Sequence, residues 1–496
     1  MHMNVNGIPR QRRLAAVSLA ACLAAAYPAA AADGTAAAAG TALVNCSPPG
    51  VKAPPCYSPQ AYQVAYGVAP LLSRGIDGRG ETVVVGPEPA AAPPSTDIRQ
   101  DLDAFDTTFG LPPASLNVVN IARSATPYLC GDEEITDTEM VHAIAPDATL
   151  DAVLEPADLI SSPAKSAAAV TSVIREGVAL HAAVISISLS IGEHFLTSAE
   201  AAQMNAALEQ AREQHITVVD GSGDTGALSR YGPPVEVGMP ASDPLVLGVG
   251  GTVLDVSPAG AYLGEMAWND NTEASGGGYS GLFPRPSYQG GLARARATRG
   301  AGLAWASGRG AGLAWASGRG AGLAWASGRG VPDVAANADP STAMALEYDD
   351  GELRPNQGTS ASGPLWAGVI TLADQEAGHP LGFVNPAIYA IARGPAYHRA
   401  FHDVITGDNS VLWPTGVFTG YTAGPGWDPV TGWGSPDAQY LVPLLAQAAG
   451  PGALQSLKIQ DPQRAGGAIE PARACHWRHR LGHRLARPGS SAFTSV

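Results

Sequence analysis

The chain has 496 residues, with 44 Asp and Glu against 29 Lys and Arg and a formal net charge of −15 at pH 7. Both ends are basic, so the acidic excess is concentrated between residues 33 and 450. A surface of this sign argues against nucleic acid as a partner. It loses self-repulsion as its carboxylates protonate, which suits acidic surroundings.

Residues 1–32 are predicted to be a secretory signal peptide. The basic stretch Arg10–Arg13 precedes the apolar run Leu14–Tyr27, and the small residues Ala29–Ala32 follow as a cleavage site. The apolar run is shorter than the ~20 residues needed to span a bilayer, and no later stretch is long and apolar enough. We therefore expect a secreted, extracellular protein that contacts no membrane once the signal is removed.

Four cysteines lie beyond the predicted signal: Cys46, Cys56, Cys130 and Cys475. An exported chain permits disulfides, and Cys46 with Cys56 could close a small loop. The pairing is otherwise open, and no pair has the spacing of a zinc site. A metal-binding role for the cysteines is therefore not expected.

From about Gly80 to Gly450, apolar runs typical of strands alternate with helical patterns. The predicted strands are Glu81–Val85, Leu116–Ile121, Leu150–Leu154, Ala183–Leu189, Ile216–Val219 and Leu245–Val249. The predicted helices are Thr96–Phe109, Glu133–Ala145, Ser166–His181 and Ser198–His215, with a capping box of Thr197 and Glu200 before the last. This alternation indicates an α/β fold with a largely parallel central sheet and helices on both faces. Catalytic groups of such sheets collect at the carboxyl ends of the strands.

Two regions look like additions to a single large catalytic domain, which we place at residues 56–450. The decapeptide AGLAWASGRG occurs three times in succession at 301–330. Removing these residues would join Arg299-Gly300 to Val331, the junction that Arg329-Gly330 makes in the full chain. Three short Gly-rich units are too small for a repeat array with its own core, so we predict a surface loop, with a binding role as the less favoured alternative. Residues 451–496 are predicted to be a disordered basic tail.

Ser360 is the candidate nucleophile. It lies in the segment GTSAS, and Leu365–Ala377 follows with helical, apolar character, Pro364 being placed in the first helical turn. A serine at a helix N-terminus can use backbone N–H groups to help stabilise an oxyanion. The alternative is a Gly/Ser-rich turn with a capping serine. A five-residue motif alone is too weakly specific to exclude it.

The partners of Ser360 decide between these alternatives. Glu133 and Asp137 are four residues apart on a predicted helix, so both carboxylates can face one site and share a proton. Asp224, in SGDTG after a predicted strand, could donate a hydrogen bond to an oxyanion if it is protonated. The competing interpretations are a solvated acidic helix start and an Asp-Gly turn. A carboxylate base combined with a protonated acid predicts activity at low pH.

Together these residues resemble the sedolisin family, the serine-carboxyl peptidases, which have a subtilisin-like fold. The resemblance extends over roughly Tyr57–Leu445 and includes ITDTEMVHAIAPDATL, SGDTGA, MPASDPLVLGVGGT, SGGGYSGLFPRPSYQ, RGVPDVAANADP, GTSASGPLWAG and FVNPAIY. It implies Ser360 as nucleophile and Glu133 as general base. It also implies that Asp137 orients Glu133 and that Asp224 stabilises the oxyanion.

Subtilisin-like enzymes also carry a GTS serine, but they pair it with a histidine in an HGTH-type motif and a strand-end aspartate. None of the eleven histidines lies in such a motif, and the first strand ends VVVGPEP, without that aspartate. Glu134 and Glu139 are weaker candidates than Glu133, because the family's spacing is Glu-x-x-x-Asp.

The resemblance also implies one structural calcium ion near the C-terminus. In HDVITGD its ligands would be Asp403 and the carbonyl of Val404. In TAGPGWDP they would be the carbonyls of Gly424 and Gly426 and the carboxylate of Asp428. Carboxylates and backbone carbonyls are hard oxygen ligands of the kind calcium prefers. Without the resemblance, the Gly-x-Gly-x-Asp spacing would be an ordinary turn.

We therefore expect a secreted, acid-active serine-type endopeptidase that cleaves protein or peptide substrates through an acyl-enzyme. Two alternatives stay open: a tripeptidyl-type exopeptidase on the same scaffold, and a catalytically silent, calcium-stabilised binding protein. Family members generally carry a long propeptide, whereas only the short segment 33–55 separates the predicted signal from Cys56. Folding without such a propeptide is unexplained by the sequence. The sequence does not fix the oligomeric state, and a monomer is the expectation.

Overall fold

The computed structural model describes residues 42–46, 55–89, 96–123, 129–229, 232–292, 327–347, 352–414 and 416–448. The predicted signal peptide, the predicted tail and residues 301–326 of the predicted insertion lie outside these ranges. Among the helices within these ranges, none is both long enough and apolar enough to cross a membrane.

A mostly parallel sheet forms the centre of the described fold. Its strands are β3 (Thr82–Pro89), β5 (Ser115–Asn120), β7 (Thr149–Glu155), β8 (Val184–Ile187), β10 (Thr217–Gly221), β14 (Val246–Val256), β15 (Tyr262–Ala267) and β18 (Val334–Asn337). The strand order is β15-β14-β10-β8-β3-β7-β5, and β18 also pairs with β14. All these neighbours run parallel except β14 and β15. The predicted α/β fold class is confirmed.

Each of the six predicted strands overlaps an observed one, but β14 is much longer than predicted. It continues from Val249 to Val256, and its second half pairs antiparallel with β15. Gly250 and Gly251 lie between the two halves, and a Cβ at Gly251 would lie 2.8 Å from the Cβ of Ala338. Close packing requires glycine at these two positions, and the two glycines interrupt the apolar run in the sequence. The predicted strand therefore ended too early.

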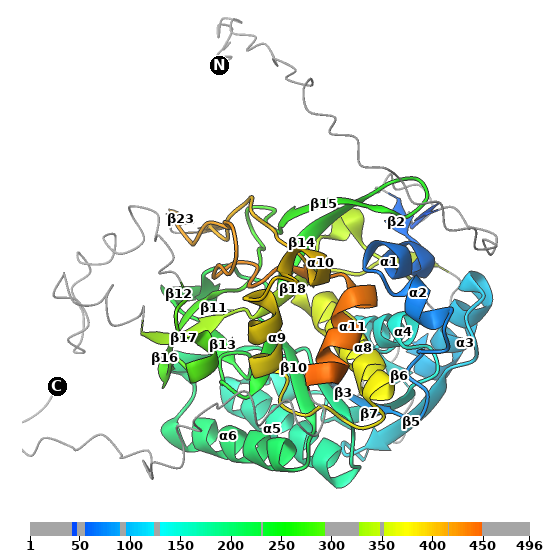
Figure 1. The fold of residues 1–496 in the computed structure, drawn as a ribbon. Helices are drawn as coiled ribbons and strands as arrows, with labels where there is room; N and C mark the ends of the chain where they lie inside the picture. Colours follow the sequence, from blue (N-terminus) through cyan, green and yellow to red (C-terminus); the bar gives the residue numbers. More distant parts are fainter. Residues whose placement is uncertain are drawn as a thin grey trace, which may run out of the picture. The chain divides into compact units, whose positions relative to one another are not determined.

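Helices cover both faces of the sheet (Figure 1). They are α1 (Pro59–Ala65), α2 (Ala69–Leu72), α3 (Ile98–Phe109), α4 (Asp132–Ile144), α5 (Pro163–Ala179), α6 (Ser198–Glu213), α8 (Thr359–Ala377), α9 (Asn385–Ala392), α10 (Tyr397–Ala400) and α11 (Ala438–Ala448). The predicted capping box before α6 is present: Thr197 Oγ1 accepts from the Glu200 N–H at 3.2 Å, and Glu200 Oε2 accepts from the Thr197 N–H at 2.7 Å.

Alternate residues of the central strands contribute to two separate cores. Val84 of β3 shares a buried cluster with residues of α5 and α6, whereas Val83 and Val85 belong to the cluster that contains residues of α4, α8 and α11. All three valines are fully buried. Burial on both faces explains why the strands read as continuous apolar runs. It also fixes their register, because a shift of one residue would exchange the two cores.

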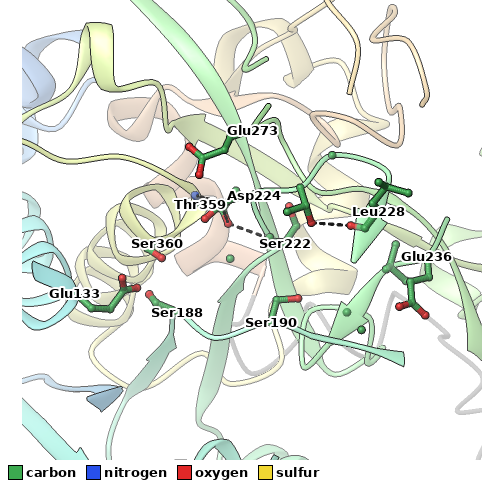
Figure 2. Close-up of a pocket in the computed structure, with 17 residues that line it drawn as sticks. Glu133, Ser188, Ser190, Ser222, Asp224, Leu228, Glu236, Glu273, Thr359 and Ser360 are labelled. Atoms are coloured by element: carbon green, nitrogen blue, oxygen red, sulfur yellow. Dashed lines mark hydrogen bonds between the residues drawn. The ribbon is translucent and has the colours of Figure 1, made fainter. Parts of the chain in front are cut away.

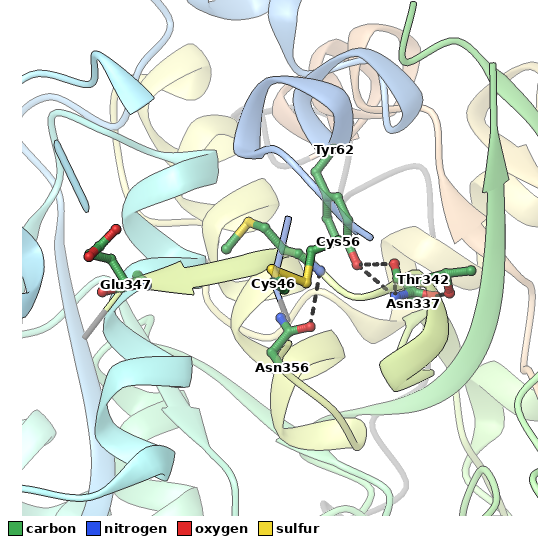
Figure 3. Close-up of a disulfide and its surroundings, with 9 residues drawn as sticks. Cys46, Cys56, Tyr62, Asn337, Thr342, Glu347 and Asn356 are labelled. Atoms are coloured by element: carbon green, nitrogen blue, oxygen red, sulfur yellow. Dashed lines mark hydrogen bonds between the residues drawn. A yellow bond between two sulfur atoms is a disulfide. The ribbon is translucent and has the colours of Figure 1, made fainter. Parts of the chain in front are cut away.

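A disulfide joins the first described segment to the rest of the fold (Figure 3). Cys46 and Cys56 are bonded, with their Cα atoms 5.6 Å apart, and both are buried. Beside them, β1 (Leu43–Val44) pairs antiparallel with β2 (Cys56–Tyr57). The predicted small loop is confirmed. Closing a loop of this size stabilises a fold by about 3 kcal/mol, chiefly by constraining the unfolded chain.

The remaining described strands form two-stranded pairs around the central sheet. The pairs are β4 (Thr96–Asp97) with β6 (Leu129–Cys130), β9 (Ile191–Gly192) with β13 (Gly238–Met239), β11 (Leu228–Ser229) with β12 (Gly232–Val235), β16 (Gly278–Pro284) with β17 (Gly328–Val331), β19 (Ala345–Glu347) with β20 (Leu353–Pro355), β21 (Phe401–His402) with β24 (Ser435–Pro436), and β22 (Val411–Trp413) with β23 (Gly416–Phe418). Of these strands, β9, β11 and β13 each contribute a residue to the wall of the cavity described below.

The end of the predicted insertion is not a surface loop. Residues 328–330 belong to β17, and all are buried. The guanidinium of Arg329 is fully buried and donates to Asp333 Oδ2 at 2.5 Å. A Cβ at Gly330 would collide with the ring of Trp427. The last repeat therefore ends in the core. The buried charge of Arg329 needs a partner there, and that partner, Asp333, lies outside the repeat.

Candidate active site

The first turn of α8 meets the loop after β10 at the carboxyl end of the sheet. Gly358, which precedes α8, has a φ of +80°, a conformation that favours glycine. A Cβ at this position would lie 2.8 Å from Oδ2 of Asp224. The glycine of GTSAS therefore allows the helix that carries Ser360 to start against the Asp224 carboxyl.

Ser360 lies at the start of this helix, as predicted, but the predicted place of Pro364 is wrong. α8 begins at Thr359, so Pro364 lies inside the helix and not in its first turn. The first turn consists of small and polar residues, which an apolar pattern does not detect. Because Pro364 has no N–H, it cannot donate to the carbonyl of Ser360. Ser360 is the second helical residue, in the turn whose N–H groups have no acceptor within the helix.

The side chain of Asp224 is bound by Thr359. Its Oδ1 accepts from the backbone N–H of Thr359 at 2.7 Å and from the hydroxyl at 2.9 Å. The same hydroxyl oxygen accepts from the N–H of Gly223 at 3.0 Å. With Oδ1 accepting two hydrogen bonds, a proton on this carboxyl belongs on Oδ2. A protonated Asp224 would therefore present one donor of defined direction.

α4 carries Glu133 and Asp137 at different depths. Glu133 is half-buried, whereas Asp137 is fully buried. Ser188, which directly follows β8, donates its hydroxyl to Asp137 Oδ1 at 2.8 Å. Figure 2 shows Glu133, Ser188 and Ser360 close together in the pocket wall. The four-residue spacing thus places one carboxyl in the site and the other behind it.

A cavity of about 280 Å³ brings these elements together. Its wall includes Glu133, Asp224 and Ser360, three of the four residues predicted to be catalytic, but not Asp137. The rest of the wall comes from the end of β10 and the segments that follow β8 and β10, from β9, β11 and β13 with the residues just before it, from the loop before β16 and from the start of α8. Among the described residues that line it there is no lysine, arginine or histidine. The described wall of the cavity is therefore acidic and offers no side-chain nitrogen base.

Sequence reasoning missed four polar residues of the cavity wall: Ser188, Ser190, Glu236 and Glu273. Ser188 stands at the carboxyl end of a strand, so the rule that placed SGDTG could have identified it. Glu236 and Glu273 lie in connections without a motif. Only the tertiary fold brings these two glutamates to the site.

A further carboxyl, that of Asp220, is buried at the end of β10. Its Oδ2 accepts from the Ala241 N–H at 2.7 Å. Burial raises the pKa of Asp220 well above its ordinary value, and the charges of Asp137 and Asp224 raise it further. At acidic pH this carboxyl is therefore neutral and adds no charge beneath the site.

The two other acids of α4 that the sequence drew attention to have structural partners. Glu134 Oε2 accepts from the Gly131 N–H at 2.9 Å at the helix start. Glu139 is fully buried and accepts from the Glu347 N–H at 2.9 Å. Burial raises the pKa of Glu139 well above its ordinary value, and neighbouring acids add to this effect. Neither side chain lines the cavity, in keeping with the choice of Glu133.

The predicted calcium ligands lie on adjoining loops. The N–H of Gly426 donates to both carboxylate oxygens of Asp403 at 3.1 Å, and the N–H of Gly424 donates to Asp428 Oδ2 at 3.0 Å. In the described part of the chain, no three His, Cys, Asp or Glu side chains cluster as a metal site would require. The predicted set has only two carboxylates, so its other ligands must be carbonyl oxygens. An all-oxygen donor set of this kind suits calcium.

Known proteins that are similar in sequence to this chain include kumamolisin, sedolisin and tripeptidyl-peptidase 1. The chain is 32% identical over 413 residues to kumamolisin of Bacillus sp. (strain MN-32), covering 80% of this chain and 65% of kumamolisin. It is 33% identical over 217 residues to sedolisin of Pseudomonas sp. (strain 101), covering 42% of this chain and 30% of that protein. It is 32% identical over 272 residues to tripeptidyl-peptidase 1 of Homo sapiens, covering 52% and 42%. The chain thus spans between 30% and 65% of the length of these curated relatives.

No protein-family model matches the chain. Among solved structures, Pseudomonas sedolisin, a serine-carboxyl proteinase complexed with two molecules of pseudo-iodotyrostatin, matches with a TM-score of 0.61 and 24% identity. The match covers 81% of this chain and 100% of that one, and it shows the fold. The chain belongs to the sedolisin family and has its subtilisin-like fold.

Proposed function

We propose that the chain is a serine-carboxyl peptidase with Ser360 as its nucleophile. The observation that carries this proposal is that Ser360, Glu133 and Asp224 line one cavity at the carboxyl end of a parallel sheet. No described histidine lines this cavity, so the bases near the serine are carboxylates. The similarity to kumamolisin and sedolisin supports the assignment.

Glu133 is the general base in this proposal. As Ser360 Oγ bonds to the carbonyl carbon of the scissile peptide, Glu133 accepts the hydroxyl proton. The C–N bond then breaks, and the amine leaves with the proton that Glu133 held. A water molecule next gives a proton to Glu133 and attacks the acyl-enzyme, and Ser360 leaves with that proton. Asp137, buried behind Glu133 and bound by Ser188, orients the base.

Asp224 stabilises the oxyanion in this proposal. A proton on Oδ2 would be donated to the oxyanion, together with N–H groups of the first turn of α8. An ionised Asp224 would instead repel the developing charge. Glu133 must therefore be ionised while Asp224 is protonated. Because the reference pKa values of Asp and Glu are about 4, we propose an acidic pH optimum, which suits a secreted enzyme with an acidic surface.

We further propose one structural calcium ion. It would be held by the carboxylates of Asp403 and Asp428 and by the carbonyls of Val404, Gly424 and Gly426. Its charge would bind two carboxylates from separate segments into one rigid region. Thermal unfolding of the Ser360→Ala variant, which cannot digest itself, should show a lower Tm with a strong chelator than with added calcium. An unchanged Tm would argue against the ion.

The choice between endopeptidase and exopeptidase needs a substrate test. The similarity to tripeptidyl-peptidase 1 favours an exopeptidase as the second candidate. An internally quenched peptide with both termini blocked can be cleaved only by an endopeptidase. A reporter released from a free N-terminal tripeptide detects the exopeptidase. We expect the blocked peptide to be cleaved.

The deciding experiment is hydrolysis of a denatured protein substrate from about pH 2.5 to 8, comparing the wild type with Ser360→Ala. A peak well below neutrality that disappears in the variant is expected, because the base and the oxyanion donor are both carboxyl groups. A peak near neutrality would mean that the base is misassigned. Folded protein without activity at any pH would favour a silent binding protein.

A further inference from the structure

Glu273 lies in the loop between β15 and β16 and lines the cavity beside Asp224 (Figure 2). Backbone hydrogen bonds fix this loop against the SGDTG segment. Ala274 N–H donates to the carbonyl of Asp224 at 2.9 Å, and Gly226 N–H donates to the carbonyl of Ala274 at 2.9 Å. Glu273 is therefore held next to Asp224 by the residue that follows it, on a segment with little freedom to move away.

The other side of the loop is fixed by Asp270. Its Oδ1 accepts from the Glu273 N–H at 2.7 Å and from the Thr272 N–H and hydroxyl at 2.9 Å each. Burial alone would raise the pKa of Asp270, but these hydrogen bonds outweigh it and lower the pKa. The lowered pKa favours the charged form of Asp270, and that charge disfavours a second negative charge on Glu273.

The contacts of Asp224 create a chemical difficulty for the proposed mechanism. Both donors of Thr359 point at Oδ1, and hydrogen bonds of this kind favour the ionised carboxylate. The oxyanion needs the protonated acid instead. Another group in the site must therefore favour the protonated form of Asp224, because the two hydrogen bonds from Thr359 favour the ionised form.

We propose that Asp224 and Glu273 act as a coupled carboxyl pair that retains one proton, and that Glu273 thereby keeps a proton available to Asp224 when the oxyanion forms. Glu273 is a positioning residue, since it acts through Asp224 and not on the substrate. This inference rests on the proposed peptidase function. In two crowded carboxyls, removal of the second proton is disfavoured by the charge left by the first. As the oxyanion develops, the proton resides on Asp224 Oδ2 and the negative charge on Glu273.

The electrostatics of the surroundings support the pair. Burial raises the pKa of Glu273, and the charges of Asp224 and Asp270 raise it further. The other titratable groups that line the cavity, Glu133 and Glu236, are acids as well. Asp220, from β10, also interacts with Asp224. No described cation lines the cavity to stabilise a doubly ionised pair.

The test is the pH profile of kcat/KM for the wild type, Glu273→Gln and the control Glu213→Gln, which removes an exposed glutamate at the end of α6. The alkaline limb of Glu273→Gln should move toward acid by on the order of one pH unit, because Asp224 alone ionises more readily. Glu213→Gln should keep the wild-type limb, and Glu273→Asp, which keeps a carboxyl, should leave the limb close to its wild-type position. A limb that stays in place or moves toward alkali, or a uniform loss at every pH, would overturn the proposal.

A second readout separates this inference from the peptidase function. If the folded wild type shows no Ser360-dependent hydrolysis, the proposed function fails, but the carboxyl pair can still be examined. The ¹³C signal of the Asp224 carboxyl, assigned by its loss in Asp224→Asn, can be followed as a function of pH. Its last titration step should occur at lower pH in Glu273→Gln than in the wild type. Identical titration curves in the two proteins would overturn the pair.

Discussion

Thr359 donates both its backbone N–H and its hydroxyl to Oδ1 of Asp224, at 2.7 and 2.9 Å. Ser360 is the next residue of the same helical turn. The turn that carries the nucleophile therefore also orients the acid proposed to stabilise the oxyanion, so a displacement of one would displace the other. This coupling gives the site a predictable response to changes at Thr359, although its side chain performs no chemistry itself.

Thr359→Val should lower kcat/KM and shift its pH profile. Valine keeps the shape of threonine but removes one of the two donors to Asp224 and the acceptor of the Gly223 N–H. Because the Asp224 carboxyl is then less firmly oriented, kcat/KM at the optimum should fall by on the order of 10- to 100-fold. Since the ionised form of Asp224 loses a donor, the alkaline limb should move toward higher pH, opposite to the shift expected for Glu273→Gln.

Thr359→Ser is the matched control, because it keeps the hydroxyl and removes only a methyl group. It should retain the wild-type limb and most of the activity. If Thr359→Val and Thr359→Ser had the same pH profile, the hydroxyl would have no influence on the protonation of Asp224, and the mechanism drawn for this carboxyl would fail.

The parts of the site that were predictable from sequence are those governed by short-range geometry. Four-residue spacing on a helix is enough to bring Glu133 and Asp137 to one face, and a motif after an apolar strand is enough to place Asp224 at the sheet edge. The position of Pro364 inside α8 was not predictable, since the first turn of the helix has no apolar pattern and Pro364 suggested a boundary. Here the contacts of Thr359 with Asp224 override local preference.

Residues brought together over long sequence separations were missed for a different reason. Glu273 reaches Asp224 through pairing between two loops 49 positions apart, and no local pattern encodes that pairing. Arg329 was assigned to a loop because its repeat is rich in glycine. Its burial depends on Asp333 and on Tyr288 and Tyr389, whose side chains surround it in the core.

Ser188→Ala should weaken both activity and folding. The Ser188 hydroxyl is a donor to the fully buried Asp137, and a hydrogen bond to a charged group contributes about 2 kcal/mol. Without this donor the proton that the pair shares stays more readily on Asp137, so Glu133 ionises more easily and the acid limb of kcat should move toward lower pH. The control Ser198→Ala removes an exposed hydroxyl on α6 and should change neither limb. A Ser188→Ala enzyme with wild-type limbs and stability would contradict the role given to this hydroxyl.

The fold should be more stable at acidic than at neutral pH. Burial raises the pKa of Glu265 to about 7 and that of Asp243 to about 6. Unfolded carboxyls titrate near pH 4, so the folded state binds more protons. The resulting stabilisation is fully present below about pH 4 and is lost as pH rises through the folded pKa values. Exposed acids with a lowered pKa, such as Asp158, oppose this trend only weakly because solvent screens them.

Denaturant unfolding of Ser360→Ala between pH 3.5 and 8 tests this expectation without self-digestion. Glu265 alone should account for a loss of roughly 3 kcal/mol between pH 4 and 7. Glu265→Gln removes the titrating group but can still accept from Tyr66 and Thr252, so its stability should fall less steeply. Glu213→Gln is again the control. Greater stability at pH 7.5 than at pH 4 would refute the expectation.

Deletion of residues 301–330 should leave the fold intact. Arg299-Gly300 would then precede Val331 and could occupy the buried position of Arg329-Gly330. The Tm of the deletion variant should stay within about 3 °C of the parent, because a shift of this size corresponds to about 1 kcal/mol. The same experiment decides whether the repeats themselves are needed for folding.

A charge-removal pair makes the deletion test specific. In the full chain, Arg329→Met leaves Asp333 buried without its cation, which should cost about 3–5 kcal/mol in the free energy of unfolding. In the deletion variant, Arg299→Met should cost about as much, whereas in the full chain it should be nearly neutral. If Arg299→Met were silent in the deletion variant, Arg299 would not have entered the buried position, and the four Arg-Gly pairs that precede Val331 would not be interchangeable.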